Sequence, residues 1–271
     1  MVLEPAEDYV HGYSGREAER LVDQAETLAL LLHHDTRYPR GSRVLEAGCG
    51  IGAQTIILAR QSPGADICSV DLSESSLAQA EARVRAAGIR NVSFRKADIY
   101  SLPFSDETFD HSFVCFVLEH LPDPALALEG LRRVLRPGGT ITVIEGDHGS
   151  AFFHPDSEAA KKAIACLVAI QREMGGNAVI GRELYPLLTG AGFREVRVSP
   201  RTVYADASRP ELVEGFTRNT FTAMVEGVRA EALQRNLIAR EEWERGIRDL
   251  YRTSEPGGTF TYTFFKGTGV K

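Results

Sequence analysis

Cysteine is scarce in this sequence, and its spacing excludes the metal frameworks that cysteine usually builds. Only four cysteines occur among 271 residues, and no two of them form a Cys-x-x-Cys pair. Structural metal sites need ligands at characteristic short spacings. We therefore expect no metal site, and the pattern fits the reducing environment of the cytoplasm.

Long apolar runs are missing as well. The longest apolar stretches, residues 113–118 and 164–170, are much shorter than the roughly 20 residues that span a bilayer. The N-terminal sequence lacks the basic and apolar regions of a signal peptide. A net charge of −6 also disfavours nucleic acid and anionic membranes, which call for a basic surface. We expect a cytoplasmic protein with neither as its main partner.

Strand and helix patterns alternate regularly between residues 43 and 145. The continuous apolar run at 109–116 is typical of a strand in a parallel sheet that is covered on both faces. Repeated βα units of this kind predict an α/β fold with a doubly wound, Rossmann-like sheet and right-handed crossovers. Strands are expected at residues 43–47, 66–71, 92–96, 109–116 and 140–145, with helices at 53–61, 73–87 and 125–134.

Helical segments flank this alternation. Ser14-Gly-Arg-Glu17 is a capping box that opens a helix of about twenty residues. After residue 145, helical patterns at 155–174, 182–189 and 210–252 accompany strand patterns at 193–204 and 259–266. We predict one domain, 1–271, with a helical cap; its parts are an N-terminal helical segment (1–40), a core (41–150), cap insertions (151–180 and 205–255) and last strands (181–204 and 256–271).

A glycine-rich segment, VLEAGCGIGAQT at residues 44–55, lies between the first expected strand of the core and the helix that follows it. Gly48, Gly50 and Gly52 permit a tight turn and allow ligand atoms to lie against the backbone. The N-terminus of the following helix presents free amides to a negatively charged group. The spacing Gly48-x-Gly50-x-x-Ala53 also satisfies the dinucleotide fingerprint. The loop therefore predicts a nucleotide-like ligand without identifying it.

Three carboxylates narrow the choice of ligand. Glu46 precedes the first glycine by two residues, where it would oppose a pyrophosphate but would suit a ligand with an ammonium and a sulfonium. Asp71 ends the second expected strand, where an acidic side chain accepts ribose hydroxyls. Asp98 follows the third strand and is placed to accept from an adenine amino group, while Ile99 packs on the ring. The alternative for Asp71 and Asp98 is a plain helix cap.

Several further stretches follow one another in a characteristic order and spacing. They are VLEAGCGIGAQT (44–55), VDLSESSL (70–77), KADIYSLPF (96–104), FDHSFVCFVLEHLPDP (109–124), LRPGGTITVIE (135–145) and GRELYPLLTGAGFREVRV (181–198). On these stretches the core resembles the class I S-adenosylmethionine-dependent methyltransferases, in particular the small-molecule enzymes of the ubiquinone/menaquinone-type methyltransferase-domain group. The resemblance implies a seven-stranded sheet with one antiparallel strand, S-adenosylmethionine as cofactor and methyl transfer as the activity.

The resemblance also implies which residues bind the cofactor. Glu46 and the glycine loop are expected to hold the methionine part, with Asp71 at the ribose and Asp98 at the adenine. N-terminal segments in this family often close over the cofactor, so Tyr13 and Arg16 are candidates for the methionine carboxylate. The full expected set is Tyr13, Arg16, Glu46, Gly48, Cys49, Gly50, Gly52, Gln54, Asp71, Leu72, Asp98, Ile99, and Cys115 and Phe116 beside the methyl donor.

Two histidines follow the fifth expected strand, at the edge where open α/β sheets bind ligands. Methyl transfer from a sulfonium is an in-line displacement, so positioning and exclusion of water supply much of the catalysis. An oxygen or carbon acceptor also needs a proton removed, and histidine is the natural base. We expect His148 and His154 to bind the acceptor or to act as base; the alternative is a histidine that hydrogen-bonds the loop. Asp147 either orients His148 or caps a turn, and Glu119 faces either the site or solvent.

Aromatic residues concentrate in the variable segments after residue 150. This predicts a covered apolar pocket for a small organic acceptor, apolar or aromatic. Transfer to O, N or C stays open, and so does assembly into a homo-oligomer. Two other functions fit the same loop: an NAD(P)-dependent oxidoreductase and a non-catalytic cofactor-binding protein. Glu46, Asp98 and the helical late region argue against the oxidoreductase.

Overall fold

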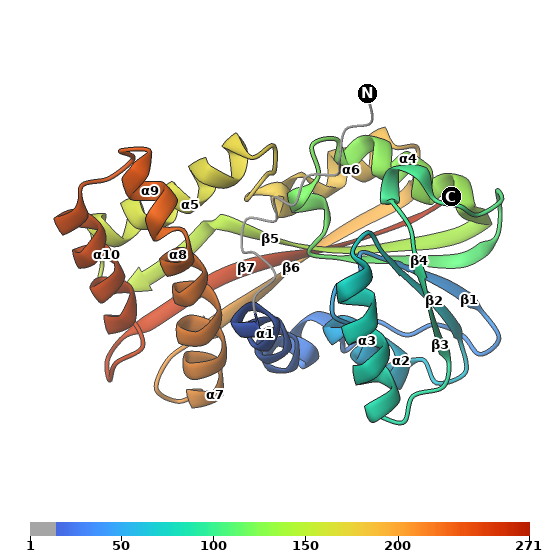
Figure 1. Cartoon of the computed structure of the whole chain (residues 1–271), viewed down its shortest axis with the longest axis horizontal. Coiled ribbons are helices and arrows are strands. Elements are labelled where there is room, and N and C mark those ends of the chain that lie inside the picture. Colours follow the sequence, from blue (N-terminus) through green and yellow to red (C-terminus); the bar gives the residue numbers. More distant parts are fainter. Residues whose placement is uncertain (1–14) are drawn as a thin grey trace.

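A single seven-stranded sheet runs through the molecule in the order β3-β2-β1-β4-β5-β7-β6 (Figure 1). Strand β7 is antiparallel to β5 and β6, and the other neighbouring strands are parallel. This computed structural model describes residues 15–271, with side chains from residue 20 onward. The predicted α/β class and the single antiparallel strand are confirmed. The strands are β1 Arg43–Ala47, β2 Asp66–Asp71, β3 Val92–Lys96, β4 Phe109–Cys115, β5 Leu135–His154, β6 Arg194–Ala205 and β7 Thr259–Val270.

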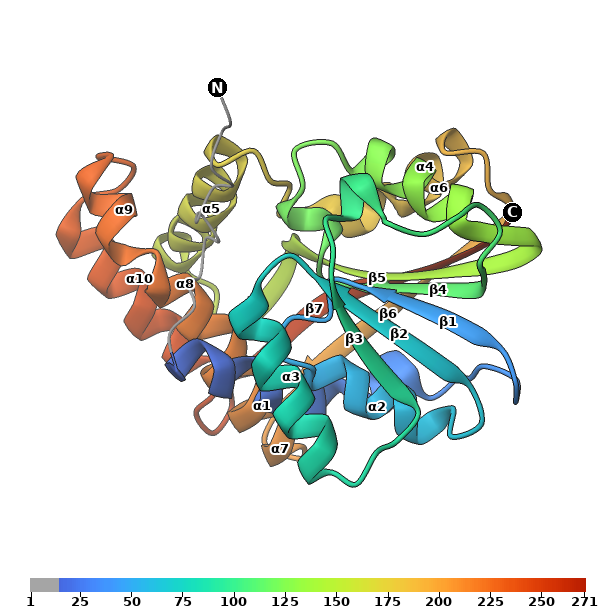
Figure 2. The ribbon, with the colours of Figure 1, turned by 45° about the vertical axis from the view of Figure 1, so that its right-hand side comes forward.

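Helices cover both faces of the parallel half of the sheet. Helices α1, α2 and α3 lie on one face, and α4 and α6 lie on the other (Figure 1, Figure 2). None of the helices in the described part of the chain is both long and apolar enough to cross a membrane. The helices are α1 Gly15–His33, α2 Ala53–Gln61, α3 Glu74–Ala86, α4 Pro124–Val134, α5 Glu158–Glu173, α6 Leu184–Gly190, α7 Pro210–Leu212, α8 Ala223–Gly227, α9 Arg229–Gln234 and α10 Arg240–Arg252, with short turns η1 Ile99–Ser101, η2 Leu118–His120 and η3 Ile180–Glu183, and the π-helix η4 Val213–Thr222.

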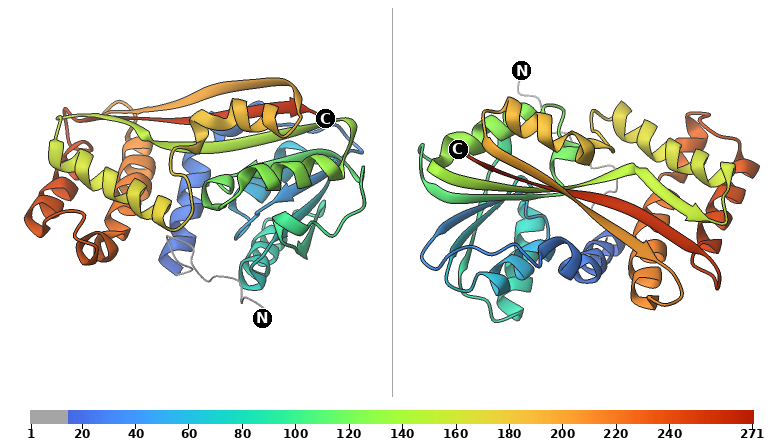
Figure 3. Two further views of the ribbon diagram at one scale, coloured as in Figure 1. Left: turned by 90° about the horizontal axis from the view of Figure 1, so that it is seen from above. Right: turned by 180° about the vertical axis from the view of Figure 1, so that it is seen from behind.

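Strands β5, β6 and β7 continue past the parallel half, and the inserted helices pack on one face of this extension (Figure 3). The reason lies in the pattern of β7, where Phe260, Tyr262 and Phe264 alternate with less apolar residues and are buried together. Phe216 of η4 and Trp243 of α10 join the same core cluster. A helical cap built on a sheet extension is therefore present, as the late helical patterns predict.

The fifth strand is longer than expected. It runs from Leu135 to His154 instead of occupying only residues 140–145. Proline and glycine at 137–139 suggest a break, but an irregular register carries the backbone past them. A second shift in register lies between Asp147 and Phe152, where β5 pairs with β7. This second shift decides where the side chains after residue 147 point.

The cap helices also differ in detail from the expectation. The helix expected at 155–174 begins at Glu158, because the Ser157 side chain accepts a hydrogen bond from the backbone at Ala160 and caps it. The segment 210–252 is not one helix but a series, α7 to α10 with η4 among them. The predicted capping box at 14–17 lies outside the described residues and side chains.

Candidate active site

The glycine loop connects β1 to α2 through three residues with positive φ. The angles are +77° at Gly48, +51° at Gly50 and +81° at Gly52, a region that favours glycine. A Cβ at Gly48 would lie 2.4 Å from the Val117 side chain, and one at Gly52 would lie 2.9 Å from Ala80. A Cβ at Gly50 would meet nothing within 4 Å. Two glycines thus allow close packing, while Gly50 leaves open the side on which a ligand would lie.

Glu46 is buried beneath this loop. Its Oε2 accepts hydrogen bonds from Ser69 Oγ at 2.5 Å and from Thr55 Oγ1 at 2.8 Å. Burial raises the pKa of this carboxyl to about 7, against the effect of the two hydroxyls. Glu46 therefore joins β1 to β2 and to α2 at the base of the loop. Contact between Glu46 and the ammonium of a ligand stays a prediction.

Asp71 and Asp98 stand at the carboxyl ends of β2 and β3 and bind backbone amides. Asp71 accepts from Gly50 N at 2.8 Å and from Ser73 N at 2.9 Å. Asp98 accepts from Tyr100 N at 2.9 Å and caps η1. Both carboxylates are only half-buried, and a carboxylate has about four acceptor positions. Both can therefore cap a turn and still bind a ligand, so their roles at ribose and adenine stay predictions.

The other expected cofactor residues fall into different surroundings. Leu72 is 49% exposed at the end of β2, and Ile99 is half-buried in η1. Gln54 accepts from a histidine of α1 instead of pointing freely outward, and Cys49 is buried. The Tyr13 prediction, and the side chain of Arg16, lie outside the part of the chain that the structure describes.

Cys115 and Phe116 lie at the carboxyl end of β4. Burial raises the pKa of the Cys115 thiol well above its ordinary value, so the thiol is neutral and fits a packed residue. Phe116 has a φ of +58°, which is rare for an aromatic residue and is held only where its surroundings fix it. Its backbone N–H donates to Ile144 O at 2.9 Å. The strained position aims the ring toward Phe264, with 5.5 Å between ring centroids.

His148 is 5% exposed and lies beside the cap. Its Nδ1 shares a hydrogen bond of 2.7 Å with the Tyr262 hydroxyl, and its ring meets Phe221 of η4 edge-on at 6.0 Å. Its Nε2 has no hydrogen-bond partner among the described residues. Burial lowers the pKa of the imidazole, which is therefore neutral near pH 7.

His154 and Asp147 are placed differently from the expectation. His154 is exposed and pairs in register with Thr259, on the face of β5 turned away from the buried aromatic residues of the cap. This position does not favour a base among those aromatic residues, and the role expected for His154 stays a prediction. Asp147 does not orient His148, because its carboxylate pairs with Arg182 at 2.6 and 2.7 Å and accepts from Gly149 N.

Two carboxyl groups that the sequence leaves without a definite role lie near each other, Glu145 within β5 and Glu119 in η2 after β4. Glu145 is fully buried, and its Oε1 accepts from Val117 N at 3.0 Å and Leu118 N at 2.8 Å. Burial, followed by the negative charge of Glu119, raises the pKa of Glu145 well above its ordinary value. Glu119 in turn accepts from Gln171 Nε2 at 3.2 Å, so it faces the protein and not solvent. The pair ties η2 to β5 and α5, because Glu145 accepts from the backbone of Val117 and Leu118 while Glu119 accepts from Gln171.

A row of aromatic side chains, here called the aromatic wall, joins the end of β4 to His148 beside the cap. Ring centroids are 5.5 Å apart between Phe116 and Phe264, 4.7 Å between Phe264 and Tyr262, and 5.9 Å between Tyr262 and His148. Sequence reasoning misses Phe264 and Tyr262, although their spacing of two in an alternating strand is the signal that puts both on one face. The aromatic wall consists of five residues: Phe116, Phe264, Tyr262, His148 and Phe221.

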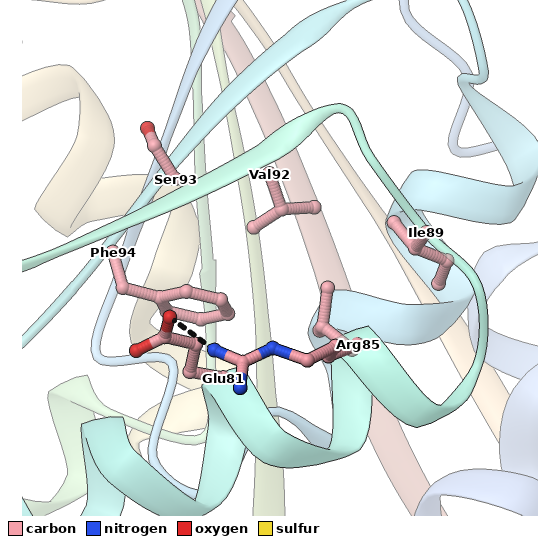
Figure 4. Close-up of a pocket in the computed structure, with 7 residues that line it drawn as sticks. Glu81, Arg85, Ile89, Val92, Ser93 and Phe94 are labelled. Atoms are coloured by element: carbon pink, nitrogen blue, oxygen red, sulfur yellow. Dashed lines mark hydrogen bonds and ion pairs between the residues drawn. The ribbon is translucent and has the colours of Figure 1, made fainter.

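A separate hollow of about 250 Å³ lies between α3 and the edge strand β3 (Figure 4). Its lining includes the ion pair of Glu81 and Arg85, along with Ile89, Val92 and Phe94. Ligand sites of open α/β sheets form at the carboxyl ends of the strands. This hollow borders the start of β3 instead, so it is not part of the candidate site.

Comparisons with known proteins agree with this geometry. Residues 45–143 match the family model described as a methyltransferase domain. The uncharacterized 37.1 kDa protein in transposon TN4556 of Streptomyces fradiae is 36% identical over 190 residues, which cover 69% of this chain and 54% of that protein. Demethylmenaquinone methyltransferase of Bacillus cytotoxicus is 35% identical over 106 residues, covering 39% and 45%. The chain spans about half the length of these curated relatives.

A solved structure shows the same fold at low identity. It is a phosphoethanolamine N-methyltransferase 2 of Haemonchus contortus in complex with phosphomonomethylethanolamine and S-adenosylhomocysteine. The TM-score is 0.58 with 19% sequence identity, over 97% of this chain and 58% of the other. The matched model shows that residues 45–143 form a methyltransferase domain, and the curated relatives and the shared fold support a class I S-adenosylmethionine-dependent methyltransferase.

Proposed function

We propose that this protein transfers the methyl group of S-adenosylmethionine to a small apolar or aromatic acceptor bound at the aromatic wall. The observation that carries the proposal is the wall itself, which joins the end of β4 to a buried histidine with an unpartnered Nε2 in the described chain. Covered apolar surface with a few placed polar groups is typical of small-molecule sites. It suits such an acceptor better than a nucleic acid or a membrane.

The residues around the glycine loop suit the cofactor chemically. Gly50 leaves space for a ligand beside the backbone, because an added Cβ there would meet nothing within 4 Å. Leu72, directly after Asp71, offers half-exposed apolar surface. Asp71 and Asp98 are half-buried acceptors for hydroxyl and amino groups. When bound, S-adenosylmethionine supplies an electrophilic methyl group.

The residues of the wall have a positioning role in this proposal. The acceptor's electron pair forms a bond to the methyl carbon as the carbon–sulfur bond breaks and its electron pair stays on sulfur. The products are the methylated acceptor and S-adenosylhomocysteine, and an acceptor that carried a proton releases it. Buried rings exclude water and orient the acceptor, which supports an in-line displacement. His148 supplies the polar contact.

Calorimetric titration and product analysis test this function. We expect purified protein to bind S-adenosylmethionine and S-adenosylhomocysteine and not NAD, and to transfer labelled methyl to at least one member of a panel of phenols, naphthols and aromatic amines. Tight binding of NAD with no response to S-adenosylmethionine would favour the oxidoreductase. Cofactor binding without any methylated product would favour a non-catalytic protein.

A further inference from the structure

His148 has one satisfied and one unsatisfied ring nitrogen in a buried setting. The side chain is 5% exposed, and Nδ1 is paired with Tyr262 Oη at 2.7 Å. Across the described side chains, Nε2 finds no partner. Buried polar atoms are almost always hydrogen-bonded, and one left unpaired at a site points to a ligand or a water. The unpaired Nε2 is therefore the polar group that a molecule bound beside the ring would meet.

The protons of the pair can be placed. Burial lowers the pKa of His148 and raises that of Tyr262 well above its ordinary value, so both groups are neutral near pH 7. Within the described residues, Nδ1 of His148 is the one acceptor at hydrogen-bond distance from the Tyr262 hydroxyl. The proton of the hydroxyl then has Nδ1 of His148 as its acceptor. A neutral imidazole carries one proton, which must therefore lie on Nε2.

The surroundings fix this arrangement in space. A Cβ at Gly146 would lie 2.4 Å from Tyr262 Oη, so glycine alone allows the hydroxyl to rest on the backbone of β5. Phe221 meets the His148 ring at an interplanar angle of 89°, and Phe264 packs on Tyr262 with 4.7 Å between centroids. Neither ring can turn without displacing an aromatic neighbour.

We infer that His148, oriented by Tyr262, donates a hydrogen bond from Nε2–H to an oxygen atom of the methyl acceptor. The inference rests on the proposed function and narrows its acceptor to an aromatic or conjugated molecule with a carbonyl, phenolate or enolate oxygen. His148 contacts the substrate as a donor, which replaces the role of base expected from the sequence. Tyr262 is a positioning residue that acts through His148.

The tautomer of His148 is the first test. Two-bond proton–nitrogen NMR spectra of protein with isotope-labelled histidine report which ring nitrogen carries the proton, and His148→Gln identifies the signal. We expect the Nε2-protonated form in the wild type and a loss of this preference in Tyr262→Phe. An Nδ1-protonated wild type overturns the inference. The measurement needs no cofactor, so a failure of the proposed function is seen separately, as absent binding of S-adenosylhomocysteine.

A pair of probes that differ by one oxygen is the second test. With S-adenosylhomocysteine bound, we expect the wild type to bind naphthol about tenfold more tightly than naphthalene, as one added hydrogen bond to a buried donor allows. His148→Phe and Tyr262→Phe should lose most of this preference and keep their affinity for S-adenosylhomocysteine. Equal affinities in the wild type, failure of naphthol to bind, or a preference that survives in His148→Phe overturns the inference.

Discussion

His33 of α1 and Gln54 of α2 are joined by a hydrogen bond of 2.8 Å between Nε2 and Oε1. The bond ties the N-terminal helix to the first turn after the glycine loop. His33 is 1% exposed, and burial lowers the pKa of its imidazole from 6.5 to about 4. The neutral ring is thus the form that donates to Gln54. Protonation of His33 at low pH should therefore weaken the attachment of α1 to the start of α2.

His33 should make the protein less stable in acid. Because its folded-state pKa of about 4 lies below the unfolded value of 6.5, the unfolded chain binds the proton more strongly. This contribution is fully present above pH 6.5 and is lost as the pH falls toward 4, by at most roughly 3 kcal/mol. Urea unfolding across this range should show a shallower decline for His33→Gln than for the wild type. Parallel stability profiles of the two proteins would contradict the prediction.

Gly50→Ala tests the open side of the glycine loop. The residue has φ +51° and nothing within 4 Å of an added Cβ, so we expect about 1 kcal/mol of strain and a methyl group where the ligand lies. Calorimetry should show S-adenosylmethionine binding weakened by about tenfold or more. Gly88→Ala is the matched control, because Gly88 has φ +69° and equally open space but lies after α3. The control should show similar strain and normal binding; an equal loss of affinity in both variants would speak against the site.

The contact between Lys266 and Asp35 should support the fold. Lys266 Nζ donates to Asp35 Oδ1 and to Thr36 Oγ1, both at 2.6 Å, and fastens the segment after α1 to β7. Lys266 is 4% exposed, so Asp35→Asn leaves a buried charge without its anion. Because the Asp35 side chain is 44% exposed, we expect a loss of only about 2 kcal/mol, less than for a fully buried pair.

Urea unfolding measures this loss against an exposed pair. Glu81→Gln breaks the ion pair between Glu81 and Arg85 (Figure 4). The side chains of these two residues are 57% and 76% exposed. That control should cost about 0.5 kcal/mol or less. Equal losses of stability in Asp35→Asn and Glu81→Gln would show that the contact with Lys266 stabilises the fold no more than an exposed ion pair does.

Alanine variants of the two histidines after residue 147 should behave differently. His148→Ala removes the donor at the wall, and we expect kcat/KM to fall by about a hundredfold, as for other buried donors at a reacting group. His154→Ala changes an exposed side chain on the opposite face and should stay within about twofold of the wild type. Initial rates with any acceptor identified by product analysis decide this. A larger loss in His154→Ala would place the acceptor elsewhere.

Much of the fold follows from local pattern. The first four strands of the core and the helices between them lie where apolar runs, glycines and caps predict, because each unit obeys its own periodicity. Buried parallel strands such as β4 allow little freedom in register. The sequence predicts the positions of the loop glycines and of Glu46, Asp71 and Asp98 for the same reason, since they lie at fixed steps from the ends of strands.

The acceptor side depends on contacts that no local pattern carries. His148 and Tyr262 are 114 positions apart in the chain, and only the pairing of β5 with β7 brings them together. His148 and His154 are separated by an even number of residues and would share a face of a regular strand. The register shift between Asp147 and Phe152 places them on opposite faces. Bulges of this kind depend on the partner strand and leave no clear mark in the sequence.

The three long strands have a mechanical consequence. Because β5, β6 and β7 all run from the parallel half into the cap, with an irregular register in β5 between Asp147 and Phe152, a hinge between the two halves would have to bend three paired strands at once. The sheet therefore resists bending between the proposed cofactor site and the proposed acceptor site, and the alignment of these two sites is set when the chain folds. Under the proposed function, the acceptor would then enter through movement of the cap helices over the sheet.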